Sequence, residues 1–178
     1  MNAAALKSNL KAIKKGGKII ANIDGFDSKN LRLANYADGI NPLEDGSLEG
    51  FELIKMDVTK MTREALKEIT LGTKEKDRAK NMFVLGFLYW MYNRNMDNTI
   101  SFIREKFSKR PEIMESNIKV LQAGYHYGDT TETFTVRYAV EKAKRSGSFI
   151  LENNVFTLPL INSQPAKNKM TQSNKSPV

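Results

Sequence analysis

Apolar residues near the start of the chain recur three or four positions apart, which is the spacing of one helix face. These residues are Leu6, Leu10 and Ile13. The spacing predicts a helix over residues 3–15. Gly16 and Gly17 follow it, and glycine favours a helix end because it accepts the left-handed cap conformation. The first helix is therefore expected to end at the glycine pair.

Two later segments carry the patterns of β-strands. Residues 18–22 form a short apolar run bounded by turn-forming residues, as in a buried strand. Residues 51–58 alternate apolar and polar positions, which predicts a second strand. The segment between them, 24–50, is expected to be rich in loops, and its residues 41–50 are packed with turn formers.

From residue 62 the pattern is helical for most of the remaining chain. The run TREALKEI begins with Thr62, which is expected to be the N-cap of its helix, and places Glu64 in the first turn. Residues 73–93 begin polar and become apolar on every side. This change predicts one helix whose second half is buried.

Two amphipathic segments follow, 97–110 and 111–125. Pro111 opens the second, and proline is tolerated in a first helical turn. The two segments are expected to form a helical hairpin that covers the buried helix. The largest buried cluster is then expected to include Phe83, Leu85, Leu88, Met91, Met114, Ile118 and Leu121.

Composition narrows the classes of function. The 178 residues are 40% hydrophobic, enough for the core of one α/β domain, and the absence of cysteine excludes disulfides, thiolate nucleophiles and cysteine-ligated iron–sulfur or zinc sites. The net charge is +8, but acids and bases are interleaved and no nucleic-acid motif is present, so no nucleic-acid partner is expected. The longest apolar run, 82–92, is shorter than the roughly 20 residues that span a bilayer. We therefore expect no membrane partner and a cytoplasmic location.

The run NIKVLQAGYHYGDTT contains the single histidine, His126, between Tyr125 and Tyr127. Histidine can act as an acid or base near neutral pH, but here no second histidine or cysteine is available to share a metal or be activated. The flanking Gly124 and Gly128 instead indicate the end of a helix. His126 is thus interpreted as a helix-end residue without a catalytic role.

Gly128-Asp129-Thr130, followed by Asn153-Asn154, superficially resembles a thiamine diphosphate motif. In that motif the third position is glycine, which lets the backbone approach the phosphates, whereas here it is Thr130. The chain alone is therefore not expected to bind thiamine diphosphate. Residue chemistry predicts no catalytic residue and no metal ligand.

Several extended blocks resemble the gamma domain of 2-oxoacid:ferredoxin oxidoreductases, in the form fused to the alpha subunit of the 2-oxoglutarate enzyme. The blocks are LKSNLKAIKKGGKIIANID, NPLEDGSLEGFELIKMDVTKMTREALKEI, TKEKDRAKNMFVLGFLYWMYNR and IREKFSKRPEIMESNIKVLQAGYHYGDTTETF. Asn81 opens the KNMFVLG helix of this family, and Lys106, Phe107, Lys109, Pro111 and Glu112 match its KF-x-K-x-PE sequence.

The resemblance implies an α/β fold, a partial three-layer Rossmann-like gamma domain with a C-terminal helical hairpin. Such enzymes decarboxylate a 2-oxoacid on thiamine diphosphate, pass electrons through iron–sulfur chemistry to ferredoxin, and release an acyl-coenzyme A. The gamma domain packs on the thiamine-binding alpha domain and the beta subunit, and helps to enclose coenzyme A. This segment would be structural, with no cofactor held by the chain alone and thiamine diphosphate, magnesium, coenzyme A and iron–sulfur clusters in the assembled enzyme.

The chain also departs from the family pattern. The glycine-rich turn and first strands of the gamma domain have no counterpart, so residues 1–144 are expected to be a fragment that lacks the N-terminal part of the domain. Residues 145–178 are expected to be an unrelated or disordered tail. The isolated chain is then expected to be inactive. The alternative is a noncatalytic protein-interaction module.

Three basic residues, Lys106, Lys109 and Arg110, come directly before Pro111. The helix that begins there offers unpaired N–H groups and the positive end of its dipole. These residues are the candidates for contact with an anion, such as coenzyme A, in the assembled enzyme. The alternative is a solvated basic turn.

Overall fold

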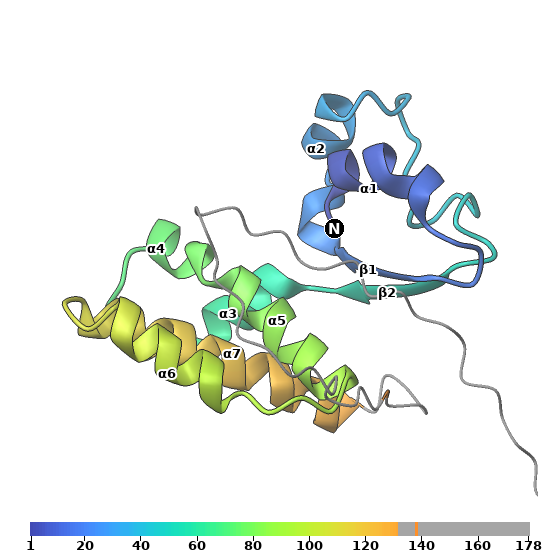
Figure 1. Ribbon diagram of the computed structural model, residues 1–178. Coiled ribbons are helices and arrows are strands. Elements are labelled where there is room, and N and C mark those ends of the chain that lie inside the picture. The colour runs from blue at the N-terminus through green and yellow to red at the C-terminus, as the bar shows by residue number, and fades with distance from the viewer. Residues whose placement is uncertain (132–137, 139–178) are drawn as a thin grey trace, which may run out of the picture. The chain divides into compact units, whose positions relative to one another are not determined.

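Two parallel strands form the sheet of the protein, β1 (Lys18–Asn22) and β2 (Glu52–Met56). The computed structural model describes residues 1–131 and residue 138, and these belong to one unit of the chain. Both strands lie where the sequence predicts them. Figure 1 shows the strands side by side, with the chain passing through helices and turns between them.

Alternate strand residues face two hydrophobic clusters, as the period of two requires. Ile19 and its partner Leu53 face the first, which we call the N-terminal cluster, and Ile20 and Ile54 face the second, the helical cluster. The N-terminal cluster has as its buried members Ala3, Leu6, Ile19, Ala21, Phe26, Ala34, Leu43 and Leu48. The helical cluster has as its buried members Ile54, Met56, Val58, Leu66, Ala79, Phe83, Phe87, Trp90, Met91 and Val120. Helices thus cover both faces of the sheet, which confirms the predicted three-layer α/β fold.

The first helix, α1 (Ala3–Asn9), continues into a 3-10 turn, η1 (Leu10–Ala12). Asn2 caps it by accepting a hydrogen bond from the N–H of Ala5 at 2.9 Å. Gly16 lies in the left-handed region with φ +74°. The helical segment ends at Ala12, because Ile13 is already extended, so it is three residues shorter than the predicted 3–15.

The segment expected to be rich in loops also contains a short helix near its start. A 3-10 turn, η2 (Ile23–Phe26), follows β1 directly and leads into α2 (Ser28–Leu33). The carboxylate of Asp27 accepts a hydrogen bond from the N–H of Asn30 at 2.7 Å and caps α2. This cap starts a helix in which Leu31, Arg32 and Leu33 have good helix propensity.

The prediction that Thr62 caps a helix is also wrong. Helix α3 (Val58–Ala65) begins four residues earlier, directly after β2, and its N-cap is Asp57, whose carboxylate accepts from the N–H of Lys60 at 3.0 Å. Thr62 is fully buried in the middle of α3. Aspartate is as good an N-cap as threonine, so the choice between them depended on where β2 ends.

The long helix expected over 73–93 is divided at Ala79 into α4 (Thr73–Arg78) and α5 (Lys80–Met91). The hairpin is present: α6 (Asp97–Lys106) contacts α7 (Pro111–Thr131) across a short turn. Helix α7 also runs alongside α5, and this pair makes the closest helix contact of the unit (Figure 1).

Helix α7 does not end at Gly124 or Gly128, so His126 is not a helix-end residue. Both glycines are buried within α7. A Cβ atom at Gly124 would lie 2.7 Å from the carbonyl carbon of Phe83, and one at Gly128 would lie 2.8 Å from Cγ of Trp90. The glycines therefore serve close packing against α5, which offsets their low helix propensity.

The predicted core is partly correct. Phe83 and Met91 belong to the helical cluster, and Leu88 packs against it. Leu121 is fully buried but is not a member of this cluster. Three other expected members are only half-buried and are not part of it: Leu85, Met114 and Ile118. Met114 and Ile118 are less buried because α7 turns another set of residues inward, namely Ser116, Val120, Leu121, Gly124 and Gly128.

Candidate functional site

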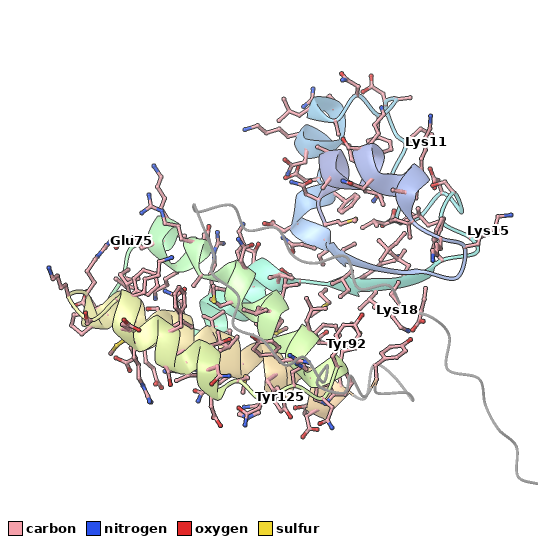
Figure 2. All side chains as sticks on the ribbon, viewed as in Figure 1. Lys11, Lys15, Lys18, Glu75, Tyr92 and Tyr125 are labelled. Atoms are coloured by element: carbon pink, nitrogen blue, oxygen red, sulfur yellow. The ribbon has the colours of Figure 1, made fainter. Side chains whose placement is uncertain are left out.

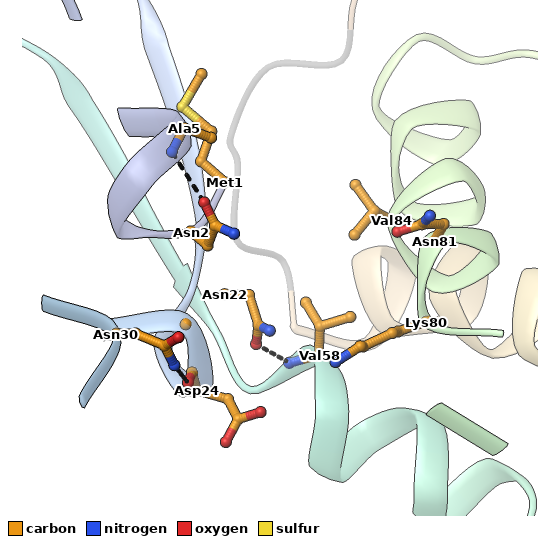
Figure 3. Close-up of a pocket in the computed structure, with 11 residues that line it drawn as sticks. Met1, Asn2, Ala5, Asn22, Asp24, Asn30, Val58, Lys80, Asn81 and Val84 are labelled. Carbon is orange, nitrogen blue, oxygen red and sulfur yellow. Dashed lines mark hydrogen bonds between the residues drawn. The ribbon is translucent and has the colours of Figure 1, made fainter. Parts of the chain in front are cut away.

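A cavity of about 400 Å³ lies at the carboxyl ends of the two strands. Its wall is formed by the first residues of the chain, by Asn22 at the end of β1, by η2 and α2, and by the start of α5 (Figure 3). In α/β proteins with parallel strands, ligands bind outside the carboxyl ends of the strands. The cavity is therefore the strongest candidate site in the described part of the chain.

A hydrogen-bond network fixes the strand ends beside the cavity. The side-chain oxygen of Asn22 accepts from the N–H of Val58 at 3.1 Å, which links the end of β1 to the first turn of α3. The hydroxyl of Thr59 donates to Asp24 Oδ2 at 2.8 Å and accepts from the amide of Asn22 at 3.5 Å. These bonds hold Asn22 and Asp24 in defined orientations.

The opposite wall comes from α5. Figure 3 shows Lys80 extending from α5 toward Val58, with Asn81 and Val84 above it. Neither Lys80 nor Asn81 makes a side-chain hydrogen bond or ion pair with any residue that the structure describes. Asn81 is the second residue of α5 and lies in the cavity wall. It also belongs to the KNMFVLG block that carries the resemblance seen in the sequence.

An ion pair holds together the two helices that precede α5 in the chain, α3 and α4. The guanidinium of Arg63 on α3 donates two hydrogen bonds of 2.8 Å to the carboxylate of Asp77 on α4. The hydrogen bond from Arg63 holds the pKa of Asp77 below its ordinary value. The pair ties α3 to the residues just before Lys80.

Sequence reasoning missed the cavity, although one signal for it was present. Asn22 is the last residue of the first predicted strand and Asp57 lies next to the end of the second, and the carboxyl ends of parallel strands share one edge. The pattern did not show whether the strands are parallel. Lys80 and Asn81, almost sixty residues beyond Asn22, carried no sign that they join it.

The predicted basic residues lie elsewhere, at the turn between α6 and α7, and none of them lines the cavity. The amino group of Lys106 lies 5.3 Å from the ring centre of Phe102. Arg110 Nη2 lies 3.9 Å from the carboxylate of Glu75, which projects from α4 (Figure 2). The positive charge of Arg110 is therefore partly balanced by a described acid.

The segment that resembles a thiamine motif is helical. Asp129 accepts a hydrogen bond from Trp90 Nε1 at 3.3 Å, and the hydroxyl of Thr130 donates to the carbonyl of His126 at 2.6 Å. With Gly128 packed on the Trp90 ring, this segment does not fit a turn that holds a diphosphate. Asn153 and Asn154, its other half, lie outside the described residues. His126 itself is exposed on α7.

Residues 1–131 and 138 contain neither a metal-binding cluster nor a membrane-spanning helix. In this part of the chain, no group of three or more histidine, aspartate or glutamate residues could hold a metal ion. None of its helices is long and apolar enough to cross a membrane.

Comparison with known proteins identifies the family. Residues 1–127 match the pyruvate ferredoxin/flavodoxin oxidoreductase family. The chain belongs to this family. The match covers the sheet, the cavity wall and most of α7, and it confirms the resemblance seen in the sequence.

One relative is the 2-oxoglutarate oxidoreductase subunit KorA of Mycobacterium tuberculosis. It is 43% identical to this chain over 143 residues, which are 80% of this chain and 22% of the relative. The chain thus spans about a fifth of the length of this family member. No solved structure matches the chain.

Proposed function

We propose that the chain forms the gamma layer of a thiamine diphosphate-dependent 2-oxoacid:ferredoxin oxidoreductase that converts 2-oxoglutarate and coenzyme A to an acyl-coenzyme A and CO2. The observation that carries this proposal is the 43% identity to a 2-oxoglutarate oxidoreductase subunit. The function is assigned to the assembled enzyme, and the isolated chain is inactive.

The chain's own residues support a structural role. The α5 and α7 pair buries the aromatic residues Phe83, Phe87 and Trp90 and gives a rigid layer against the sheet. Rigid elements hold binding groups more precisely than loops do. In the proposed enzyme this layer packs on the thiamine-binding alpha domain and the beta subunit, and ferredoxin accepts electrons from elsewhere in the assembly. We place the enzyme in the cytoplasm.

Thiamine diphosphate supplies the carbanion chemistry of decarboxylation when it is bound. Its site belongs to other parts of the enzyme in this proposal, because the packing of Gly128 and the bond from Trp90 to Asp129 do not fit a diphosphate turn. Calorimetric titration of the purified chain with thiamine diphosphate and magnesium tests this assignment. We expect no binding, and a stoichiometric micromolar site would contradict it.

Coenzyme A is the group that this layer would help to enclose. Lys106, Lys109 and Arg110 remain candidates for a contact with its anionic groups, since the α6–α7 turn exposes all three. Their role would be electrostatic, because exposed amino and guanidinium groups attract phosphates. The range of this attraction decreases as the ionic strength rises.

A chimera tests the proposed function directly. The matched segment of the mycobacterial subunit is replaced by the corresponding residues of this chain, and reduction of an artificial electron acceptor is measured with 2-oxoglutarate and coenzyme A. We expect activity comparable to that of the unmodified enzyme. The matched control carries Gly86→Leu in the same chimera, which separates α5 from α7.

A chimera that folds and assembles but lacks activity would overturn the proposal. It would favour a noncatalytic interaction module, which keeps the surface of the family without its reaction. Assembly is measured by co-purification with the partner subunit, so that loss of activity is distinguished from loss of folding.

A further inference from the structure

The cavity at the strand ends has a side rich in hydrogen-bond donors. The orientation of Asn2 is set by its bond from the N–H of Ala5, which occupies the side-chain oxygen and leaves the amide nitrogen of Asn2 as a donor. The side-chain oxygen of Asn22 likewise accepts from the N–H of Val58, and its amide nitrogen, which donates one hydrogen to Thr59 at 3.5 Å, has a second N–H for a ligand. Lys80 adds an ammonium group with no ion pair among the described residues. Donors of this kind bind anionic oxygens.

The other side offers acceptors. Asp24 uses Oδ2 to accept from Thr59, so Oδ1 remains to accept from a ligand. The amide nitrogen of Asn30 donates to the carbonyl of Asp24 at 3.4 Å, which leaves the side-chain oxygen of Asn30 as an acceptor. Both residues follow β1, in η2 and α2. A ligand that fits this side carries hydroxyl or amino donors.

Apolar side chains separate the two polar sides. Ala5, Val58 and Val84 line the cavity, and they can contact a flat or apolar part of a ligand. The volume of about 400 Å³ lies at the lower end of the range for small-molecule sites, about 300–1,000 Å³. The cavity therefore suits a small ligand with an anionic group on one side, hydroxyl groups on the other and an apolar face between them.

We propose that this cavity binds the ribose phosphate group of a nucleotide, with Lys80 and the amides of Asn2 and Asn22 on the phosphate and Asp24 on the ribose hydroxyls. A carboxylate that follows a parallel strand commonly accepts from ribose hydroxyls in Rossmann-like folds. A lysine provides a compact positive charge for phosphate.

The nucleotide has two sources, a free adenine nucleotide or the nucleotide end of coenzyme A. In the second case the inference rests on the proposed function and assigns coenzyme A to the strand-end cavity instead of the α6–α7 turn. In the first case the cavity is a separate nucleotide site. The donor and acceptor sides are the same for both sources.

Binding to the purified full chain tests the inference without any enzymatic activity. The probes are AMP, ribose 5-phosphate, adenosine and coenzyme A, followed by calorimetry or by NMR shifts of the Asn22, Asp24 and Lys80 signals. We expect saturable binding of AMP and ribose 5-phosphate. Displacement of AMP by coenzyme A identifies the nucleotide end of coenzyme A as a ligand, and binding of AMP without displacement identifies a free nucleotide.

Two variants assign the sides of the cavity. Lys80→Ala is expected to weaken AMP and ribose 5-phosphate by about tenfold, the loss of one charge-assisted contact, while adenosine is unaffected. Asp24→Asn is expected to weaken AMP and adenosine alike. The matched control, Lys74→Ala, removes an exposed lysine of α4 that does not line the cavity.

Absence of saturable binding at millimolar nucleotide would overturn the inference, as would binding that Lys80→Ala and Asp24→Asn leave unchanged. Circular dichroism of both variants establishes that they fold. The chimera measures the proposed function independently, so an active chimera without nucleotide binding in this cavity refutes only the inference.

Discussion

Gly86 on α5 lies directly against the backbone of Leu121 on α7. A Cβ atom at Gly86 would be 2.9 Å from the carbonyl carbon of Leu121 and 2.9 Å from the backbone nitrogen of Tyr125. Gly124 makes the reciprocal approach to Phe83. The two helices therefore meet through their backbones, which leaves no room for even one methyl group.

This contact predicts a large effect of a small substitution. Gly86→Ala is expected to lower the free energy of unfolding by about 3 kcal/mol, because backbone atoms cannot move aside as a flexible side chain can. Urea denaturation measures the change. The control is Gly72→Ala, where the nearest atom to the new methyl group is Glu75 Oε2 at 3.9 Å.

The Gly72→Ala control is expected to change the free energy of unfolding by less than about 1 kcal/mol, since its methyl group meets only ordinary contacts. Equal stability of Gly86→Ala and the unsubstituted chain would show that α5 and α7 do not approach as described.

Thr62 provides a second prediction. It is fully buried, and its hydroxyl has no hydrogen-bond partner among the described residues. Thr62→Val keeps the shape and removes the unsatisfied group, so it is expected to stabilise the protein by about 1 kcal/mol in thermal or urea unfolding. If Thr62 were the N-cap of α3, the same change would destabilise the protein.

The matched variant is Asp57→Ala, which removes the observed cap of α3. It is expected to cost about 1 kcal/mol of stability. A loss of stability in Asp57→Ala together with a gain in Thr62→Val would show that Asp57 caps α3 in solution.

The ion pair of Arg63 and Asp77 predicts a pH dependence. The hydrogen bond from Arg63 lowers the pKa of Asp77 in the folded protein, whereas in the unfolded chain that pKa is near 3.9, a rough value for a free aspartate. The contribution to stability is therefore complete above the unfolded pKa. It is lost as the pH falls through the folded pKa.

Asp77→Asn should accordingly be less stable than the unsubstituted protein near neutral pH, by a small amount because the pair is partly exposed. The difference should shrink as unfolding is measured at progressively more acid pH, below about 3.9. Asp38→Asn, in an exposed turn, is the control. A difference that persists unchanged into acid would refute the ion pair.

The basic turn is tested in the chimeric enzyme. Lys109→Ala together with Arg110→Ala is expected to raise the Michaelis constant for coenzyme A several-fold and to weaken its salt dependence, if these residues meet its anionic groups. Glu75→Gln should lower that constant, because Glu75 competes for Arg110. If the Michaelis constant for coenzyme A is unchanged in both variants, the turn is a solvated surface that does not contact coenzyme A.

Local patterns predicted the elements that depend on nearest neighbours. The apolar run of β1 and the alternation in β2 predicted strands, and both strands are present. Successive side chains of a strand point to opposite faces, so the positions of the apolar residues fix which faces are buried. The blocks around Asn81 and Pro111 also carried the family resemblance that the match over residues 1–127 confirmed.

Other features depended on what lies across the fold. Gly124 and Gly128 favour helix ends in isolation, but the close approach of α5 keeps α7 helical to Thr131. Thr62 and Asp57 are equally good caps locally, and the end of β2 selects Asp57. In each case tertiary packing supplies a free energy that local propensity does not contain.

By itself, then, the sequence determined the α/β class, the strands and most helices, because these rest on the local spacing of apolar and polar residues. It also indicated the family, through blocks that resemble those of known members. Only the tertiary structure decided where the candidate site lies. Parallel pairing brings the end of β1, with Asn22 and Asp24, to the start of α3, and the packing of α5 places Lys80 and Asn81 on the opposite wall. Residues nearly sixty positions apart meet there because the sheet and the helices bury their apolar faces together, a condition that no segment satisfies alone.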